Sequence, residues 1–183
     1  EQFVPLAGLT SQRPVTRATV KHVECEISEL LTHQLLTKAN RTYRTEVQDI
    51  LLAALWLCLH AHTGEQNIVI GLESHGRQEL FDVDVSDTVG WFTTLFPVLL
   101  NGADAASPAA VIKHVKENLR SIPDYGRGYG VLQYLSKDAT AKAALPAQGW
   151  DVLFNYLGQF DNLFEDKGYL HDAHESTGAS IGD

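Results

Sequence analysis

The sequence predicts an α/β (α+β) fold, in which a β-sheet is packed with helices inside a single domain. Its 183 residues, 44% of them hydrophobic, suit one domain with a sizeable packed core. A β-branched run, Ile68–Ile70 followed by Leu72, has no polar alternation and predicts a strand covered on both faces. Apolar residues recur at helical spacing on both sides of this run, which predicts the flanking helices.

The segments before this strand predict a linker, a first strand and a first helix. Residues 1–14 lack periodicity and are typical of a linker or a crossing strand. Within 18–27, apolar residues alternate with glutamates, which predicts a strand with one solvent-exposed face. An amphipathic helix follows, and its apolar stripe is Ile27, Leu30, Leu31, Leu35 and Ala39.

A second helix is expected to be central and buried. Thr45 and Gln48 have the spacing of a capping box, which predicts that this helix begins there. The segment is apolar almost all round over 50–59, and Gly64 is expected to end it.

A strand and a helix are predicted after the central strand. The strand covers 89–96, and Pro97 implies an edge position or a bulge after it. Ser107–Pro108 starts a helix that Pro123 ends. The buried stripe of this helix is Val111, Val115, Leu119 and Ile122.

A glycine-rich loop over 124–130 is predicted to lead into a short helix over 131–135. Gly126, Gly128 and Gly130 do not follow a strand and do not match G-x-G-x-x-G, so a dinucleotide fingerprint is excluded. The glycines allow either a close approach of the backbone to a thin ligand or a tight turn between two helices.

The last clear strand, over 152–157, contains two polar residues in an apolar context. Asn155 and Tyr156 need hydrogen-bond partners there, and because they are successive they are expected to face opposite sides. Either one of them faces a cavity, or Asn155 is a buried amide that bridges neighbouring strands.

Composition excludes several classes of function. With 14 basic and 23 acidic residues the net charge is -9, which disfavours nonspecific electrostatic binding of nucleic acid. Cys25 and Cys58 form no C-x-x-C pair and are expected to be reduced thiols. The longest apolar run is too short to cross a bilayer, and no signal sequence opens the chain, so a cytoplasmic protein without membrane contact is expected.

The first candidate for chemistry is Glu73, at the carboxyl end of the buried strand, where α/β sheets commonly meet ligands. A carboxylate there can carry a proton; the structural alternative is that Glu73 pairs with Arg77 in a turn. Ser74 and His75 are adjacent and cannot readily form a nucleophilic pair. The segment from His75 to Arg77 is interpreted as a turn in which the guanidinium donates to carbonyls or a carboxylate.

No metal site is predicted from the eight histidines. The pairs His60 with His62 and His171 with His174 are the only suggestive spacings, and the second pair lies in a polar tail with little periodicity.

Taken in order, these segments resemble the epimerization domains of nonribosomal peptide synthetases. Residues 46–55 resemble the family's buried helix motif, and residues 72–79 resemble its E-G-H-G-R-E signature. Residues 87–93 with Pro97 are similar to the V-G-W-F-T segment. Residues 123–130 fit P-x-x-G-x-G-Y-G, and residues 154–161 match F-N-Y-L-G-Q-F-D.

The resemblance implies a two-lobed, chloramphenicol-acetyltransferase-like fold with a mixed β-sheet packed with helices. The H-H-x-x-x-D-G motif of the family is absent from this sequence, so residues 1–183 are interpreted as the carboxyl-terminal lobe, with 1–16 as the inter-lobe connection. The amino-terminal lobe and a final strand and helix are expected outside it. Ser74 stands in place of the usual glycine and Gln78 in place of the usual glutamate.

The implied reaction is L to D inversion at the α-carbon of an aminoacyl or peptidyl thioester. Glu73 would be one proton carrier and a histidine of the amino-terminal lobe the other, while Asn155 and Tyr156 would orient the thioester or assist the acid and base. The thioester would hang on the 4'-phosphopantetheine arm of a partner carrier domain, with no cofactor bound by this chain itself. The residues assigned to the tunnel for this arm are His75, Arg77, Trp91, Gly126, Gly128 and Tyr129.

Two other interpretations stay open. A condensation domain shares the fold and the carrier-borne thioesters but forms a peptide bond. A non-catalytic lobe would only dock carrier domains, and Ser74 and Gln78 point mildly in that direction. On the split-site interpretation, the isolated chain is expected to be inactive.

Overall fold

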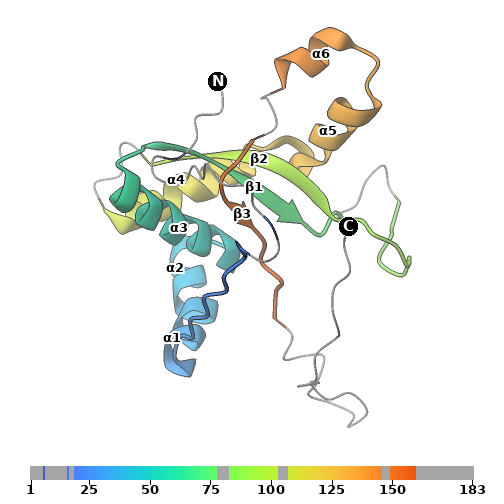
Figure 1. The fold of residues 1–183 in the computed structure, drawn as a ribbon. Helices are drawn as coiled ribbons and strands as arrows, with labels where there is room; N and C mark the ends of the chain where they lie inside the picture. Colours follow the sequence, from blue (N-terminus) through green and yellow to red (C-terminus); the bar gives the residue numbers. More distant parts are fainter. Residues whose placement is uncertain are drawn as a thin grey trace.

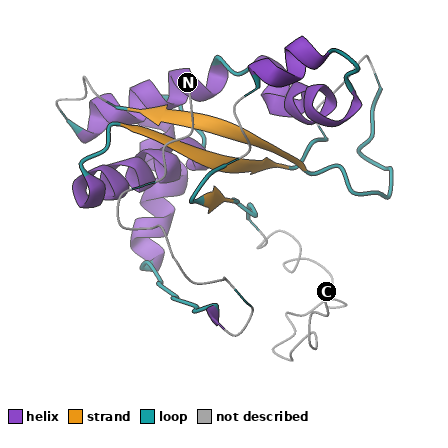
Figure 2. Cartoon of the chain, turned by 45° about the horizontal axis from the view of Figure 1, so that its top comes forward, coloured by secondary structure: helices purple, strands orange, loops and turns teal. Residues whose placement is uncertain are grey.

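The computed structural model describes residues 6 and 16 and the ranges 19–77, 83–102, 107–145 and 149–159. Its centre is a three-stranded sheet with the strand order β2-β1-β3. β1 (Asn67–Ser74) runs antiparallel to β2 (Thr94–Asn101) and parallel to β3 (Leu153–Phe154). Figures 1 and 2 show this mixed sheet with helices packed against it, which confirms the predicted fold class.

The core lies between one face of the sheet and two long helices. Ile68, Ile70 and Leu72 of β1 alternate toward this face and are at most 2% exposed. They pack together with buried residues of β2 and of the helices α3 (Val47–Thr63) and α4 (Pro108–Arg120), which lie side by side in Figure 1. The opposite face of β1 is only partly covered. The prediction of a strand covered on both faces is therefore confirmed for one face only.

Helix α3 begins one residue later than predicted. Glu46, rather than Thr45, has the extended N-cap backbone, and its N–H donates to Asp49 Oδ2 at 2.9 Å. Gly64 ends the helix with a φ of 77°, as expected. The apolar run is buried on one side only, because the described part of the chain covers just the side that faces the sheet.

Helix α4 follows the prediction closely. The side chain of Ser107 accepts a hydrogen bond from the Ala110 N–H, and Pro108 occupies the first turn. Val111 and Val115 are buried, and the helix ends at Arg120, shortly before the proline expected to stop it.

The predicted first strand, 18–27, is wrong, because residues 20–28 form no regular secondary structure and are exposed. A strand needs a partner to receive its hydrogen bonds, and no described strand lies beside this segment. The helix predicted next is confirmed. It is a continuous helical stretch that projects away from the sheet (Figure 1). It consists of α1 (Glu29–Gln34), the π-helical η2 (Leu35–Ala39) and α2 (Asn40–Tyr43). Leu30 and Leu31 of its apolar stripe are 66% and 55% exposed.

β2 begins five residues later than the strand predicted over 89–96, and it continues beyond Pro97 to Asn101. Pro97 pairs with Gly71, and β2 is an edge strand of the described sheet, as its proline implied. β3 is shorter than the predicted 152–157, although the Val152 carbonyl also accepts a hydrogen bond from the Gly71 N–H at 2.9 Å.

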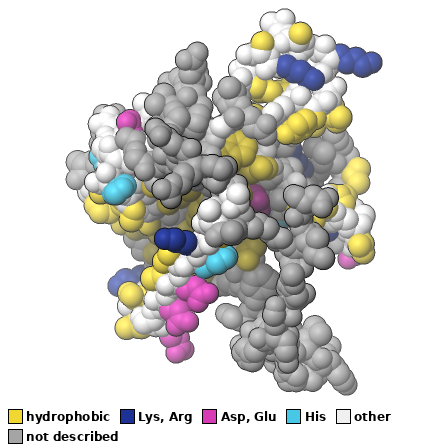
Figure 3. All heavy atoms as spheres, viewed as in Figure 1, with side chains coloured by type: hydrophobic (Ala, Val, Ile, Leu, Met, Phe, Trp, Pro, Cys, Tyr) yellow, Lys and Arg dark blue, Asp and Glu magenta, His cyan; other side chains and the backbone are white. Residues whose placement is uncertain are grey.

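The predicted loop over 124–130 is helical in its second half. A 3-10 turn, η3 (Pro123–Gly126), contains three successive residues with positive φ, at Asp124, Tyr125 and Gly126. The chain then becomes helical at Arg127, earlier than expected, through α5 (Arg127–Gly130) and the π-helical η4 (Val131–Leu135), and α6 (Ala139–Ala144) follows. Hydrophobic side chains gather in this part of the molecule on the face seen in Figure 3.

Residues 1–16, expected as an inter-lobe connection, are described only at Leu6 and Thr16. Leu6 is 3% exposed, and its N–H donates to Asp151 Oδ2 at 2.6 Å. None of the helices in the described part of the chain combines the length and the apolar character needed to cross a bilayer. Cys25 and Cys58 are both free thiols, and both are exposed.

Candidate functional site

A pocket of about 420 Å³ opens at the carboxyl end of β1. It lies where the central strand, the segment after β3 and the start of α3 meet. The residues that line it are Glu46, Gln48, Glu73, Ser74, His75, Thr93, Asn155, Tyr156, Leu157 and Gly158. Four of the predicted site residues, Glu73, His75, Asn155 and Tyr156, are therefore brought together.

The register of β1 and β3 explains why Asn155 meets Glu73. Leu72 pairs with Phe154 in the parallel ladder, so the next residue of each chain segment turns to the same face of the sheet. Asn155 Nδ2 donates a hydrogen bond to Glu73 Oε2 at 2.6 Å. Asn155 thus links two neighbouring segments at the rim of the sheet, as the bridging interpretation predicts, but it is exposed and not buried.

Tyr156 lines the same pocket as Asn155, although successive residues of a strand face opposite sides. The regular strand ends at Phe154, before either residue, so the alternation no longer constrains them. Two polar groups of different chemistry, an amide and a phenol, therefore lie on one wall beside the carboxylate.

Arg77 takes no part in an ion pair with Glu73, whose side-chain partner is Asn155. Its guanidinium donates to the Val85, Thr88 and Gly90 carbonyls at 2.8, 2.9 and 3.1 Å. It also lies 4.5 Å from the centroid of the Phe92 ring. The predicted donation to carbonyls is confirmed, and it ties the turn after β1 to the segment that precedes β2.

His75 acts within the same turn, where its Nδ1 accepts a hydrogen bond from the Arg77 N–H at 3.1 Å. Gly76 has a φ of 67°, and a Cβ there would collide with the Phe92 carbonyl. The segment from His75 to Arg77 is therefore a structural turn, as expected, and it also puts the imidazole at the pocket.

The other predicted tunnel residues do not line this pocket. Trp91 and Tyr129 line a second pocket, of about 690 Å³, whereas Gly126 is buried against the Phe96 ring and Gly128 is exposed. Burial raises the pKa of the Tyr129 phenol, and the nearby Tyr134 adds to this effect. The close approach that Gly126 allows is thus to the Phe96 side chain of the core and not to a ligand. The assignment of these residues to a tunnel stays a prediction.

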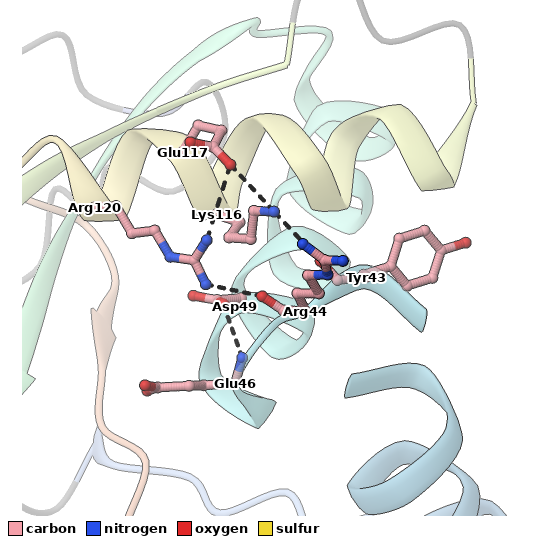
Figure 4. A network of polar contacts seen from close by, with 7 residues as sticks. All are labelled: Tyr43, Arg44, Glu46, Asp49, Lys116, Glu117 and Arg120. Atoms are coloured by element: carbon pink, nitrogen blue, oxygen red, sulfur yellow. Dashed lines mark hydrogen bonds and ion pairs between the residues drawn. The ribbon is translucent and has the colours of Figure 1, made fainter. Parts of the chain in front are cut away.

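Sequence reasoning missed Glu46 and Gln48 as pocket residues, because Gln48 was assigned to a helix cap with Thr45 and Glu46 only to the helix motif over 46–55. A polar network between α4 and the end of α2, drawn in Figure 4, holds the segment that leads into α3. Lys116 Nζ donates to the Tyr43 carbonyl at 3.3 Å, and Arg120 donates to the Arg44 carbonyl at 2.8 Å. Glu117 pairs with both cations, at 3.1 and 3.9 Å. Long-range contacts of this kind leave no local signal in the sequence.

The histidines show no sign of metal chemistry where they are described. His60 stacks on Trp56 with ring centroids 4.7 Å apart, and its Nδ1 lies 2.8 Å from the Glu65 carbonyl. Across the described residues, no group of three or more His, Cys, Asp or Glu side chains is arranged to hold a metal ion. His171, His174 and the substituted position Gln78 lie outside the described residues.

Known proteins are similar to this sequence over most of its length. A subunit of linear gramicidin synthase from Brevibacillus parabrevis is 46% identical over 182 residues, which are 98% of this chain and 2% of that protein. Surfactin synthase subunit 2 of Bacillus subtilis (strain 168) is 48% identical over 165 residues, which are 88% of this chain and 4% of that protein. The chain thus spans only a small part of the curated relatives it matches.

A solved structure shares the fold as well. The crystal structure of the epimerization domain from the third module of tyrocidine synthetase B is 38% identical, with a TM-score of 0.57, over 61% of this chain and 25% of that one. The family model of the condensation domain matches residues 1–179, nearly the whole sequence. On this match and these identities, the chain belongs to the condensation domain family.

Proposed function

We propose that this chain supplies one side of an epimerization site, in which Glu73 moves the proton on the α-carbon of an aminoacyl or peptidyl thioester. The observation that carries the proposal is the 2.6 Å hydrogen bond from Asn155 Nδ2 to Glu73 Oε2 within the wall of a 420 Å³ pocket. An amide that holds a carboxylate in one orientation favours proton transfer at a defined place, since general acid–base catalysis depends first on geometry.

The chemistry needs two proton carriers and an electrophilic donor. The Glu73 carboxylate takes the proton from the α-carbon, which leaves a carboxylic acid and a thioester enolate. Return of a proton on the opposite face inverts the centre, and the resemblance gives that second role to a histidine of the amino-terminal lobe. The Tyr156 phenol lines the same pocket and is suited to donate a hydrogen bond to the enolate oxygen.

The thioester would arrive on the phosphopantetheine arm of a carrier domain, so the prosthetic group belongs to that partner. This chain would contribute the wall residues that hold the acyl group. The split of the proton carriers between two lobes is also the reason to expect that residues 1–183 alone do not epimerize.

Condensation is the second candidate, because the family model that matches residues 1–179 is that of the condensation domain. In that reaction two carrier-borne groups are joined by a peptide bond, and no proton is exchanged at the α-carbon. The epimerization signature around Glu73 and the 38% identity to an epimerization domain favour the first candidate.

Solvent deuterium uptake at the α-carbon of a carrier-bound thioester separates the candidates. It is measured in the full-length protein that contains this chain, as the native sequence, as Glu73→Gln and as Glu65→Gln. Glu65 is an exposed glutamate beyond the opposite end of β1 and serves as the matched control. Epimerization predicts exchange that Glu73→Gln lowers by about 10²- to 10⁴-fold or confines to one stereoisomer, while Glu65→Gln leaves it unchanged.

Peptide-bond formation without exchange would establish the condensation activity instead. A protein that does neither, yet still binds the loaded carrier domain, would be a docking lobe.

A further inference from the structure

A smaller pocket opens beside the one at Glu73. Its volume is about 110 Å³, and three of its lining residues, Glu46, Gln48 and Ser74, also line the pocket of 420 Å³. Ser74 follows Glu73 in β1, and successive residues of a strand face opposite sides of the sheet. The larger pocket therefore reaches round the end of β1 to the face that carries Ser74, where the smaller pocket begins. We call the smaller one the side pocket.

The inner wall of the side pocket is apolar and belongs to the core. Leu72 of β1 and Phe96 of β2 are paired in the antiparallel ladder and are 2% and 4% exposed. Leu119 of α4 and Ile122, which follows that helix, also line the pocket and pack against the same core. The side pocket is thus a recess between packed elements of this chain, rather than an exposed apolar face.

Two charged residues of the side pocket already have partners within the fold. The Asp49 carboxylate is 7% exposed and accepts the Glu46 N–H at 2.9 Å. The Arg120 guanidinium donates to the Arg44 carbonyl at 2.8 Å and lies 3.9 Å from the Glu117 carboxylate, as Figure 4 shows. Because these charges are satisfied by the fold, the surface left for an occupant is mainly the apolar wall.

The volume of the side pocket matches one aliphatic side chain. A dry apolar cavity of roughly 150 Å³ holds a benzene molecule, so a recess of about 110 Å³ holds about four carbons but no aromatic ring. In the proposed function the reacting α-carbon lies at Glu73, and the side chain on that carbon needs a space of its own next to it. The side pocket offers such a space, since it is joined to the reaction pocket through three shared residues.

We propose that the side pocket binds the side chain of the residue that is epimerized, so that this residue is a branched aliphatic one of the size of valine, leucine or isoleucine. This inference rests on the proposed function, because it places the α-carbon at Glu73. Leu119 and Ile122 are then specificity-determining residues, which contact the substrate side chain and take no part in proton transfer.

Two partly buried residues of α4 give a matched test. Leu119 lines the side pocket, whereas Ile112 packs against the same core and does not line it. The variants are Leu119→Ala, which enlarges the pocket, and Leu119→Phe, which fills it, with Ile112→Ala and Ile112→Phe as controls.

The substrates differ only in the side chain of the reacting residue. In the full-length protein, kcat/KM for α-carbon exchange is measured with carrier-bound alanyl, leucyl and phenylalanyl thioesters. Each is offered alone and with one glycine before the reacting residue, and the form that exchanges faster is used for all comparisons.

The decisive quantities are the ratios of kcat/KM for the leucyl substrate to kcat/KM for the alanyl and phenylalanyl substrates. Both native ratios are expected to be about tenfold or more, since the side chains differ by several carbons in an apolar pocket. Leu119→Ala is expected to lower the leucyl-to-phenylalanyl ratio by about tenfold, and Leu119→Phe to lower the leucyl-to-alanyl ratio by about tenfold. The Ile112 variants are expected to leave both ratios unchanged.

Native ratios at or below one overturn the inference. Ratios that the Leu119 variants leave unchanged, or that the Ile112 variants change equally, overturn it as well. Urea unfolding shows which variants fold. If neither Leu119 variant folds, Ile122→Ala takes their place, because it also enlarges the pocket, and a leucyl-to-phenylalanyl ratio that it does not lower overturns the inference.

Failure of this inference is distinguishable from failure of the proposed function. Exchange that is equally efficient with all three residues refutes the side pocket as a binding site and leaves Glu73 as the proton carrier. Absence of exchange with every thioester refutes epimerization itself.

Discussion

The side-chain amide of Asn155 donates a 2.6 Å hydrogen bond to the carboxylate of Glu73, across 82 residues of sequence. The contact exists because β3 lies parallel to β1, with Leu72 opposite Phe154. It gives the proposed proton carrier a fixed orientation at the rim of the central strand. The first prediction concerns this pair.

Asn155→Ala removes the amide and is expected to lower α-carbon exchange by roughly ten- to a hundredfold. The reason is that a hydrogen bond to a charged group contributes about 1.5–3 kcal/mol, and the freed carboxylate loses its orientation. Asn101→Ala is the control, since Asn101 Nδ2 donates to Asn67 Oδ1 at 2.7 Å at the far end of the same ladder. Equal loss of exchange in both variants would show that the effect is general damage to the sheet.

Arg77→Lys is expected to destabilise the protein by about 1–3 kcal/mol, because one ammonium cannot reproduce three carbonyl contacts and a ring contact. Urea unfolding measures the free energy, and limited proteolysis reports on the segment 83–93. Arg41→Lys, on the exposed side of α2, is expected to change neither. An unaltered cleavage pattern in Arg77→Lys would contradict the role of the guanidinium in holding that segment.

Gly126→Ala is expected to cost about 2–4 kcal/mol of stability. The residue has a φ of 76°, which L side chains rarely adopt, and its Cβ would collide with the Phe96 ring. Gly64→Ala isolates the backbone part of this cost, about 1–2 kcal/mol, because its φ is 77° and nothing lies within 4 Å of the added Cβ. Urea unfolding of both variants gives the difference, and equal losses would mean that Phe96 moves aside freely.

Tyr129 makes the stability depend on alkaline pH. Its pKa is raised in the folded protein, mainly because burial disfavours the phenolate, so the unfolded chain releases this proton first as the pH rises. The contribution is fully present below the pKa of the unfolded chain, about 10, and is lost as the pH rises toward the folded value.

Tyr129→Phe is therefore expected to lose less stability than the native protein between about pH 9 and pH 11. Urea unfolding across this range measures the effect, and absorbance of the phenolate reports the titration. Tyr156→Phe is the comparison variant. An identical alkaline loss in Tyr129→Phe and the native protein would exclude Tyr129 as its source.

Local patterns predicted the elements whose formation depends on local interactions. Helix α4 begins at Ser107 and Pro108 as expected, because an N-cap hydroxyl and a proline in the first turn act within four residues. The strand predicted over 18–27 is wrong because a strand is completed only by a neighbour elsewhere in the chain. Its alternating residues have no such neighbour among the described strands.

The residues of the candidate site also divide into those that local patterns predict and those that only distant contacts bring into place. The position of Glu73 near the carboxyl end of the buried strand is readable from an apolar run and the polar residues after it. The sequence does not decide whether Arg77 donates to carbonyls or to a carboxylate, because a guanidinium binds both kinds of acceptor. Glu46 and Gln48 were missed as pocket residues because what brings them to the pocket is the packing of α3 against the sheet.

The sequence by itself thus determined the class of fold, the order of its main elements and the element that carries Glu73, because periodicity and capping are properties of neighbouring residues. Only the tertiary structure decided that Asn155 holds Glu73, that Arg77 binds three carbonyls, and that Trp91 and Tyr129 line a second pocket. The contact between Asn155 and Glu73 depends on the register of β1 against β3, and strand register is settled by contacts between residues far apart in the chain.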